Sequence, residues 1–162
     1  GTGYGRWLHG EFTSFEAPGR FGLVQCVFDA LNNLLDPADF LAAARRVHDR
    51  LEPEGLFIFD INTPYGLRDL WDDSFVQGWL GSDWYGWTHS WDEESSIATI
   101  EAGFLIDSRE WLEVHRERAY GQAELRDLLA RAGFTSVEII DYPEGEPAAA
   151  DAPRVWVVAQ RG

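Results

Sequence analysis

The sequence has one cysteine and few basic residues, and each shortage excludes a class of structure or partner. Because Cys26 stands alone, an intrachain disulfide and a multi-thiolate metal site are both excluded. Lysine is absent, and 13 arginines face 28 acidic residues, giving a net charge of −15. A field of this sign repels phosphate backbones and anionic lipid surfaces. We therefore expect neither nucleic acid nor an acidic membrane as a partner.

Long apolar runs are also absent. No run approaches the ~20 residues that a membrane span needs, and the N-terminus lacks the basic start and apolar stretch of a secretory signal. With the single cysteine, this predicts a protein of the reducing cytoplasm. The length of 162 residues and the hydrophobic content of 45% predict one domain over residues 1–162.

The first half of the chain has the pattern of a βαβ unit. The apolar run Phe21–Phe28 predicts a buried strand, and Leu56–Ile61 predicts a second one. Between them, apolar residues recur at helical spacing over Asp36–Leu51, with Asp36 as a cap and Pro37 at the first helical position. Two strands joined in this way are expected to lie parallel and adjacent, with a right-handed crossover.

The second half changes character. Tryptophan and charged residues share the stretch from Asp83 to Tyr120, and the partial alternation of apolar and polar positions predicts an antiparallel meander. A helix and two closing strands should follow it. The expected strands of the meander are Trp84–Trp91, Ile97–Ile106 and Trp111–Tyr120, and the later elements are the helix Gln122–Ala132 and the strands Val137–Ile140 and Val155–Ala159.

Three segments together carry a resemblance to a known family: the strand and turn Phe21–Leu35, the stretch Leu51–Asp60 with its L-x-P-x-G turn, and Ala132-Gly133-Phe134. In this order they resemble class I S-adenosylmethionine-dependent methyltransferases. The meander, ending in His115–Tyr120, is similar to the small-molecule branch that includes glycine and amino-sugar N-methyltransferases. The resemblance implies an α/β fold, a Rossmann-like methyltransferase sheet lacking its first two strands, with residues 83–120 as an inserted antiparallel β meander.

The sequence departs from this family in several places. The family's first strand ends in a glycine-rich turn against the methionine end of the cofactor, and an acidic residue closes its second strand. Neither strand is found here, and Gly1–Gly5 is interpreted as an N-terminal remnant because no apolar strand precedes it. The family also has Asp where Gly22 stands and a second Gly where Glu54 stands.

The resemblance assigns the cofactor, S-adenosylmethionine, to two segments. Glu11 would accept a hydrogen bond from the adenine amino group, and Phe12 would pack beside the purine. Val27 and Phe28 would line the cofactor. The remaining two candidates, facing the methionine group or the acceptor, are Asp29 and Asn33.

The residues alone leave these roles open. A solvated Glu11 and a core Phe12 are equally consistent with the sequence, and Asp29 and Asn33 could be helix caps. The position of Asp29 and Asn33 after a parallel strand favours a ligand site, because open α/β sheets bind ligands at that edge.

Two histidines are candidates for catalysis. By resemblance, His89 lies near the acceptor amine, where a neutral imidazole could accept a proton, and His115 has the same possible role. Both could instead be surface or packing residues. His9, His48, His89 and His115 have no close metal-ligand spacing, so no metal site is expected.

The expected function is methyl transfer from S-adenosylmethionine to nitrogen or oxygen of a small-molecule acceptor. The alternative is a non-catalytic methyltransferase-like fragment that acts as a binding or dimerisation module. Without neighbouring strands, Phe21–Phe28 would be an apolar sheet edge that pairs with a second copy or takes Arg6–Gly10 as its neighbour, with weak cofactor affinity as the result. At least one of four tryptophans should also line a cleft or a subunit contact: Trp84, Trp87, Trp91 and Trp111.

Overall fold

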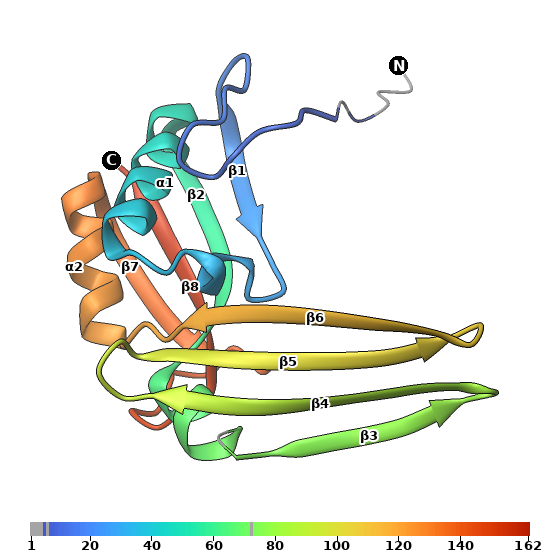
Figure 1. The fold of residues 1–162 in the computed structure, drawn as a ribbon. Helices are drawn as coiled ribbons and strands as arrows, with labels where there is room; N and C mark the ends of the chain where they lie inside the picture. Colours follow the sequence, from blue (N-terminus) through green and yellow to red (C-terminus); the bar gives the residue numbers. More distant parts are fainter. Residues whose placement is uncertain (1–4, 6, 72) are drawn as a thin grey trace.

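The computed structural model describes residue 5 and residues 7–71 and 73–162, which form two sheets and two α-helices (Figure 1). The elements of the first half are β1 (Phe21–Cys26), the 3-10 helix η1 (Ala30–Asn33), α1 (Pro37–Arg50), β2 (Leu51–Asn62) and the π-helix η2 (Tyr65–Leu70). The later elements are β3 (Phe75–Leu80), β4 (Asp83–Asp92), β5 (Ile97–Ile106), β6 (Arg109–Arg118), α2 (Gln122–Ala132), β7 (Phe134–Asp141) and β8 (Arg154–Arg161).

The first sheet has the strand order β1-β2-β8-β7. β1 and β2 are parallel neighbours joined through α1, which confirms the predicted βαβ unit. β8 runs antiparallel to both β2 and β7, so the sheet is mixed. The carboxyl ends of β1 and β2 therefore meet at the same edge, which is the edge nearest the second sheet (Figure 1).

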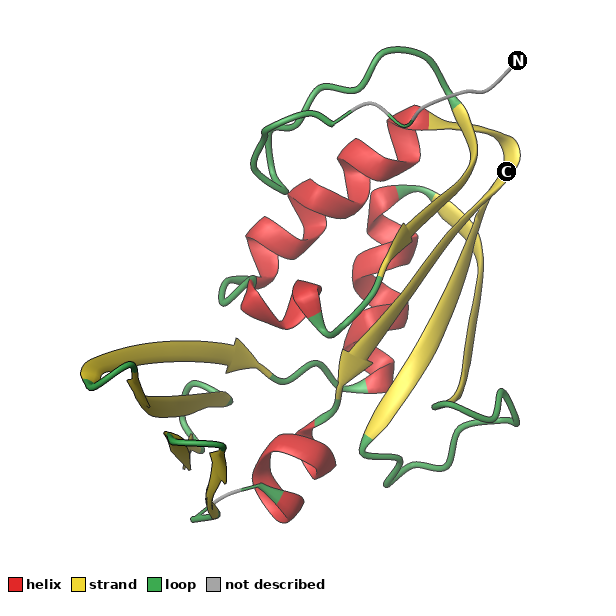
Figure 2. Cartoon of the chain, turned by 90° about the vertical axis from the view of Figure 1, so that its right-hand side faces the viewer, coloured by secondary structure: helices red, strands yellow, loops and turns green. Residues whose placement is uncertain are grey.

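Sequence signals at the helix ends explain where the helices begin and stop. The Asp36 carboxylate accepts a hydrogen bond from the Ala38 amide at 2.8 Å, and Pro37 occupies the first helical turn. The other helix, α2, stops at Gly133, whose φ of 109° lies in the left-handed region open to glycine. Both helices cover the same face of the first sheet (Figure 2).

The main core lies between the two helices and this sheet face. Alternate residues of β2 and β8 point into it, and Phe59 and Val157 are fully buried there against Leu125 and Leu129 of α2. On the opposite face of the sheet, no described residue forms a covering helix (Figure 2). Phe21 and Leu23 of β1 are 40% and 51% exposed.

The second sheet is an antiparallel meander in the order β3-β4-β5-β6. The inserted region is longer than the predicted 83–120, because an unexpected strand, β3 at Phe75–Leu80, precedes it. Gly78 makes this strand hard to recognise, yet it has a packing role: a Cβ there would lie 2.5 Å from the Tyr85 hydroxyl. At the other end, Tyr120 lies outside β6 and is buried in the main core.

The expected neighbour of β1 is not observed. Trp7–Gly10 forms no strand in the structure, so its docking as a strand against β1 was wrong for these residues, and Arg6 lies outside the described part. Of Gly1–Gly5, only Gly5 is described. Pairing of β1 with a second copy stays a prediction.

Glu54 lies in β2 at a position where the resemblance predicts a glycine, and its backbone conformation is one that favours glycine. Its φ of 63° is left-handed, a conformation that costs roughly 1–2 kcal/mol for a residue with a Cβ. We expect Glu54→Gly to raise the free energy of unfolding by about 1 kcal/mol, measured by urea denaturation. Glu52→Gly, two residues earlier at an ordinary φ, should lower it by about 0.5–1 kcal/mol. Equal effects of both substitutions would contradict the strain argument.

Candidate functional site

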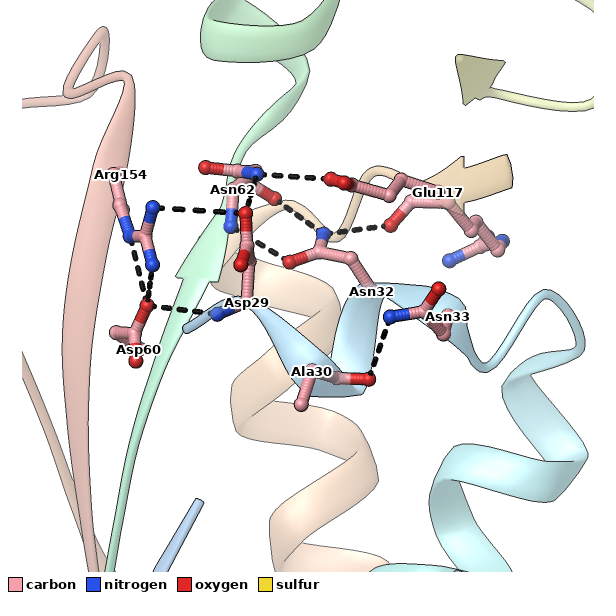
Figure 3. Close-up of polar contacts among 9 residues, drawn as sticks. Asp29, Ala30, Asn32, Asn33, Asp60, Asn62, Glu117 and Arg154 are labelled. Atoms are coloured by element: carbon pink, nitrogen blue, oxygen red, sulfur yellow. Dashed lines mark hydrogen bonds and ion pairs between the residues drawn. The ribbon is translucent and has the colours of Figure 1, made fainter. Parts of the chain in front are cut away.

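Polar side chains from five elements meet beside the carboxyl ends of β1 and β2 (Figure 3). They come from the turn after β1, from η1, from the end of β2, from the end of β6 and from the start of β8. We call them the strand-end cluster: Asp29, Asn32, Asp60, Asn62, Glu117 and Arg154.

The turn after β1 has an unusual backbone. Phe28 and Asp29 have φ values of 62° and 48°, so two consecutive residues other than glycine are left-handed. Such strain costs about 1–3 kcal/mol per residue and persists only where its surroundings enforce it. Here the Asp29 amide donates a hydrogen bond to Oδ2 of Asp60 at 3.0 Å. The turn leaves the Phe28 side chain 79% exposed.

Asp60 and Arg154 anchor this turn. The Asp60 side chain is buried, at 1% exposure, and its Oδ2 accepts hydrogen bonds from Nε of Arg154 at 2.7 Å and from Nη2. Nη1 of Arg154 lies 3.6 Å from Oδ2 of Asp29. One guanidinium therefore links the end of β2 to the turn after β1.

Asn62 joins two carboxylates. Its Nδ2 donates to Oδ2 of Asp29 and to Oε2 of Glu117, both at 2.9 Å. Burial raises the pKa of Glu117 above its ordinary value; the hydrogen bond from Asn62 opposes the shift and the charge of Asp29 adds to it. Glu117 can therefore hold a proton at a higher pH than an exposed glutamate.

Asn32 connects the two sheets at this site. It is fully buried, its Oδ1 accepts from the Asn62 amide at 2.9 Å, and its Nδ2 donates to the carbonyls of Asn62 at 3.0 Å and Arg118 at 2.8 Å. The ends of β2 and β6 are therefore held against η1 by one side chain.

A cavity of about 390 Å³ lies between β1, α1 and the segment before β1. Glu11 and Phe12 line it together with Val24, Cys26 and Phe40. Burial raises the pKa of the Cys26 thiol to about 11, with a contribution from the charge of Asp60. The thiol is thus protonated at neutral pH, and the cavity wall at Cys26 is uncharged.

The two candidate histidines lie in the meander and are each bound to a neighbour. Nδ1 of His89 lies 2.7 Å from the Ser74 hydroxyl, and its ring packs at 5.2 Å from Trp71. Nε2 of His115 lies 3.1 Å from Oε2 of Glu113. Within the described part of the chain, neither histidine forms a hydrogen bond or ion pair with the strand-end cluster.

Of the remaining candidates from the sequence, one belongs to the strand-end cluster and two lie outside it. Asp29 belongs to the strand-end cluster, and although it is the residue before η1, its side chain makes no cap hydrogen bond. Asn33 is exposed and donates to the Ala30 carbonyl, which fits the local helix role left open by the sequence. Val27 is half-buried beside the turn.

The sequence reasoning missed most of the cluster. Asp60 and Asn62 end an apolar strand, the same signal that identified Asp29, so this signal could have found them. Glu117, Arg154 and Asn32 come from other elements and reach the site through the fold.

None of the four named tryptophans is fully buried, although Trp91 packs against the small core of Leu67, Ala98 and Ala119. Trp111 is 57% exposed, and Trp84, Trp87 and Trp91 are half-buried, which confirms that they are not all enclosed. Their role in a cleft or subunit contact stays a prediction.

His89 should make stability depend on pH. Burial lowers the pKa of His89 below 6.5, and a backbone hydrogen bond at Ser74 partly opposes this shift. The unfolded chain then binds a proton at His89 more readily than the folded chain does. The contribution of neutral His89 to the free energy of unfolding is therefore fully present above pH ~6.5 and is lost as the pH falls through the lowered pKa. We expect His89→Gln to reduce the loss of unfolding free energy between pH ~7 and ~5, measured by urea denaturation. An unchanged pH dependence would contradict this.

Within residues 5, 7–71 and 73–162, no group of three potential ligands is placed to hold a metal ion. In the same part of the chain, no helix has the length and apolar character needed to cross a membrane.

The chain matches known methyltransferases. No family model matches it. A relative from Geobacillus sp. (strain WCH70), named a "putative methyltransferase", is 24% identical over 158 residues, which are 93% of this chain and 63% of that protein. The chain thus spans less than two thirds of the length of this relative.

Solved structures show the same fold. An S-adenosylmethionine-dependent methyltransferase from Clostridium acetobutylicum ATCC 824 superposes with a TM-score of 0.86 at 20% identity, over 94% of this chain and 63% of that one. CalS10, an amino pentose methyltransferase from Micromonospora echinaspora solved with S-adenosylmethionine bound, gives a TM-score of 0.73 at 18% identity, over 94% and 63% of the two chains. At these identities the likeness establishes an α/β methyltransferase fold.

Proposed function

We propose that the protein to which this chain belongs transfers a methyl group from S-adenosylmethionine to nitrogen or oxygen of a small-molecule acceptor. The observation that carries the proposal is the strand-end cluster, which places Asp29, Asn62 and Glu117 together beside the carboxyl ends of two parallel strands. Open α/β sheets bind ligands at this edge. The fold shared with methyltransferases supports the same conclusion.

The residues around β1 fit the two ends of the cofactor. The cavity lined by Glu11 and Phe12 is large enough for a purine ring and offers a carboxylate for the adenine amino group. Phe28 and Asp29 stand at the turn beyond β1, where an aromatic ring and a carboxylate are available to the methionine portion. The cofactor would supply an activated methyl group on its sulfonium.

The chain's own residues would then bind, orient and exclude water. Positioning supplies much of the rate of such a transfer, so a dedicated base is a smaller contribution. His89 and His115 are proposed to lie on the acceptor side, because both belong to the meander that flanks the strand ends.

Isothermal titration of the chain with S-adenosylmethionine tests the proposal. We expect the chain to bind the cofactor. Glu11→Gln should weaken this binding by about tenfold, since a charged hydrogen bond contributes roughly 1.5–3 kcal/mol. Glu16→Gln is a matched control, because Glu16 also lines the cavity without being assigned to the adenine. Equal affinity in wild type and Glu11→Gln would remove Glu11 from the site, and no binding would favour the fragment alternative.

A dimerisation module is the second candidate function, and the exposure of Phe21 and Leu23 on β1 favours it. The partner would be a second copy of the chain paired along β1. Sedimentation velocity should then show a dimer that Leu23→Lys converts to a monomer. A wild-type chain that is monomeric at all concentrations would contradict this candidate.

A further inference from the structure

Glu117 differs from the other titratable groups on its side of the meander. Residues that pair directly across strands share a face. Ile100 pairs with His89 and His115, and Ala98, two residues earlier, pairs with Glu117. The three titratable side chains therefore lie on one face of the second sheet.

Of these three groups, Glu117 alone belongs to the strand-end cluster, and it alone forms a hydrogen bond with another member of the cluster in the described part of the chain. His89 is bound to Ser74, and His115 is bound to Glu113. Oε2 of Glu117 instead accepts a hydrogen bond from Asn62, the amide that also contacts Asp29 (Figure 3). Its Oε1 accepts no hydrogen bond from a described residue, so it has capacity for a further donor.

We propose that Glu117 binds the acceptor: its carboxylate receives the ammonium group of a basic amine and takes a proton from it. This inference rests on the proposed methyl transfer and names both the class of acceptor and the residue that activates it. Glu117 would then be a catalytic residue that neither candidate histidine replaces.

The charges around the site favour a cation. Asp29, Asp60 and Glu117 contribute three carboxylates, and the guanidinium of Arg154 is bound to Asp60 and lies near Asp29. One positive charge is therefore shared among three negative ones. An ammonium beside Glu117 would lower the net negative charge of the cluster.

The proton transfer balances without a further reactant. An N–H bond of the acceptor ammonium breaks, the proton joins an oxygen of Glu117, and the electron pair stays on nitrogen as the free amine. That lone pair forms the new N–CH3 bond while the C–S bond breaks and its electrons stay on sulfur. The products are the methylated ammonium, the demethylated cofactor and protonated Glu117, which then releases its proton to solvent.

The surroundings of Glu117 suit this role. Burial and the charge of Asp29 raise its pKa, while the hydrogen bond from Asn62 and the charges of Arg154 and His115 lower it. The net direction is upward, so a proton taken from an amine is held better than on an exposed glutamate. Affinity for an ammonium ion should rise with pH as Glu117 ionises, until the amine itself loses its charge.

The test uses cyclohexylammonium as the probe and cyclohexanol as its uncharged counterpart. Each is titrated into the 13C,15N-labelled chain, and the Glu117 carboxyl and Asn62 side-chain amide resonances are followed by NMR. Cyclohexylammonium should shift both resonances and lower the pKa of Glu117, because bound ligand and ionisation favour each other. Cyclohexanol should shift neither.

Two variants distinguish binding of the ammonium by Glu117 from nonspecific attraction to an acidic protein. Glu117→Gln should weaken cyclohexylammonium binding by about tenfold, as expected for loss of a charged hydrogen bond. Glu113→Gln, which removes an exposed carboxylate four residues earlier on β6, should change it by less than about twofold. Failure of the probe to bind, or equal binding to Glu117→Gln, overturns the proposal.

Calorimetry with S-adenosylmethionine keeps this outcome distinct from that of the proposed function. An ammonium response at Glu117 without cofactor binding would overturn the methyltransferase proposal and leave an amine-binding site. Cofactor binding without an ammonium response would overturn the role of Glu117 alone.

Discussion

Replacement of Asn32 by alanine should lower the free energy of unfolding by about 3–4 kcal/mol. The side chain is fully buried and makes three hydrogen bonds, to the amide and carbonyl of Asn62 and to the carbonyl of Arg118. Its loss leaves these backbone groups without partners, and each buried unsatisfied group costs about 1–3 kcal/mol. Urea denaturation followed by tryptophan fluorescence measures the change.

Asn33 is a natural control for this experiment. It is the next residue in η1, but it is exposed and makes one hydrogen bond to the Ala30 carbonyl. Asn33→Ala should therefore change the unfolding free energy by less than about 0.5 kcal/mol. If Asn32→Ala were equally mild, Asn32 would not be what joins the ends of β2 and β6.

The second large effect is expected for Asp60→Ala, which should destabilise the fold by about 3 kcal/mol. The substitution removes the carboxylate from a buried ion pair with Arg154 and also removes the acceptor for the Asp29 amide. Breaking a buried pair by deleting one partner costs about 3–5 kcal/mol, and partial exposure of Arg154 places this case at the lower end.

The exposed pair of Arg68 and Asp69 provides the comparison for Asp60. Their side chains are in contact at 2.9 Å in solvent, where such pairs contribute at most about 1 kcal/mol. Asp69→Ala should accordingly have a small effect in the same denaturation experiment. A loss below about 1 kcal/mol for Asp60→Ala would contradict its role in holding the turn after β1.

The elements that the sequence predicted well are those with strong local signals. α2 was expected at Gln122–Ala132 and has those bounds, because its leucines recur at helical spacing and Gly133 stops it. β1 ends at Cys26 rather than at Phe28, since the left-handed turn at Phe28 depends on the distant Asp60. No local pattern encodes that contact.

The candidate site was predictable only where its residues follow an apolar strand. Asp29 was found in this way, but Glu117 lies in a stretch of alternating charges that is typical of a solvated face. Arg154 begins a strand and resembles an ordinary surface arginine in sequence. Glu117 and Arg154 reach the strand-end cluster because β6 ends, and β8 begins, beside the end of β2. The topology of the fold sets this placement, so no local sequence pattern predicts it.

The two contacts of the Asn32 amide also bear on how this fold changes over evolution. The chain leaves the first sheet after Asn62 and returns to the main core after Arg118, at Tyr120 and α2, and the carbonyls of Asn62 and Arg118 accept hydrogen bonds from the same nitrogen. An excursion that departs and returns at one point can gain or lose residues at small entropic cost, because its ends remain together. The meander is therefore a segment that can gain or lose residues while the first sheet stays intact.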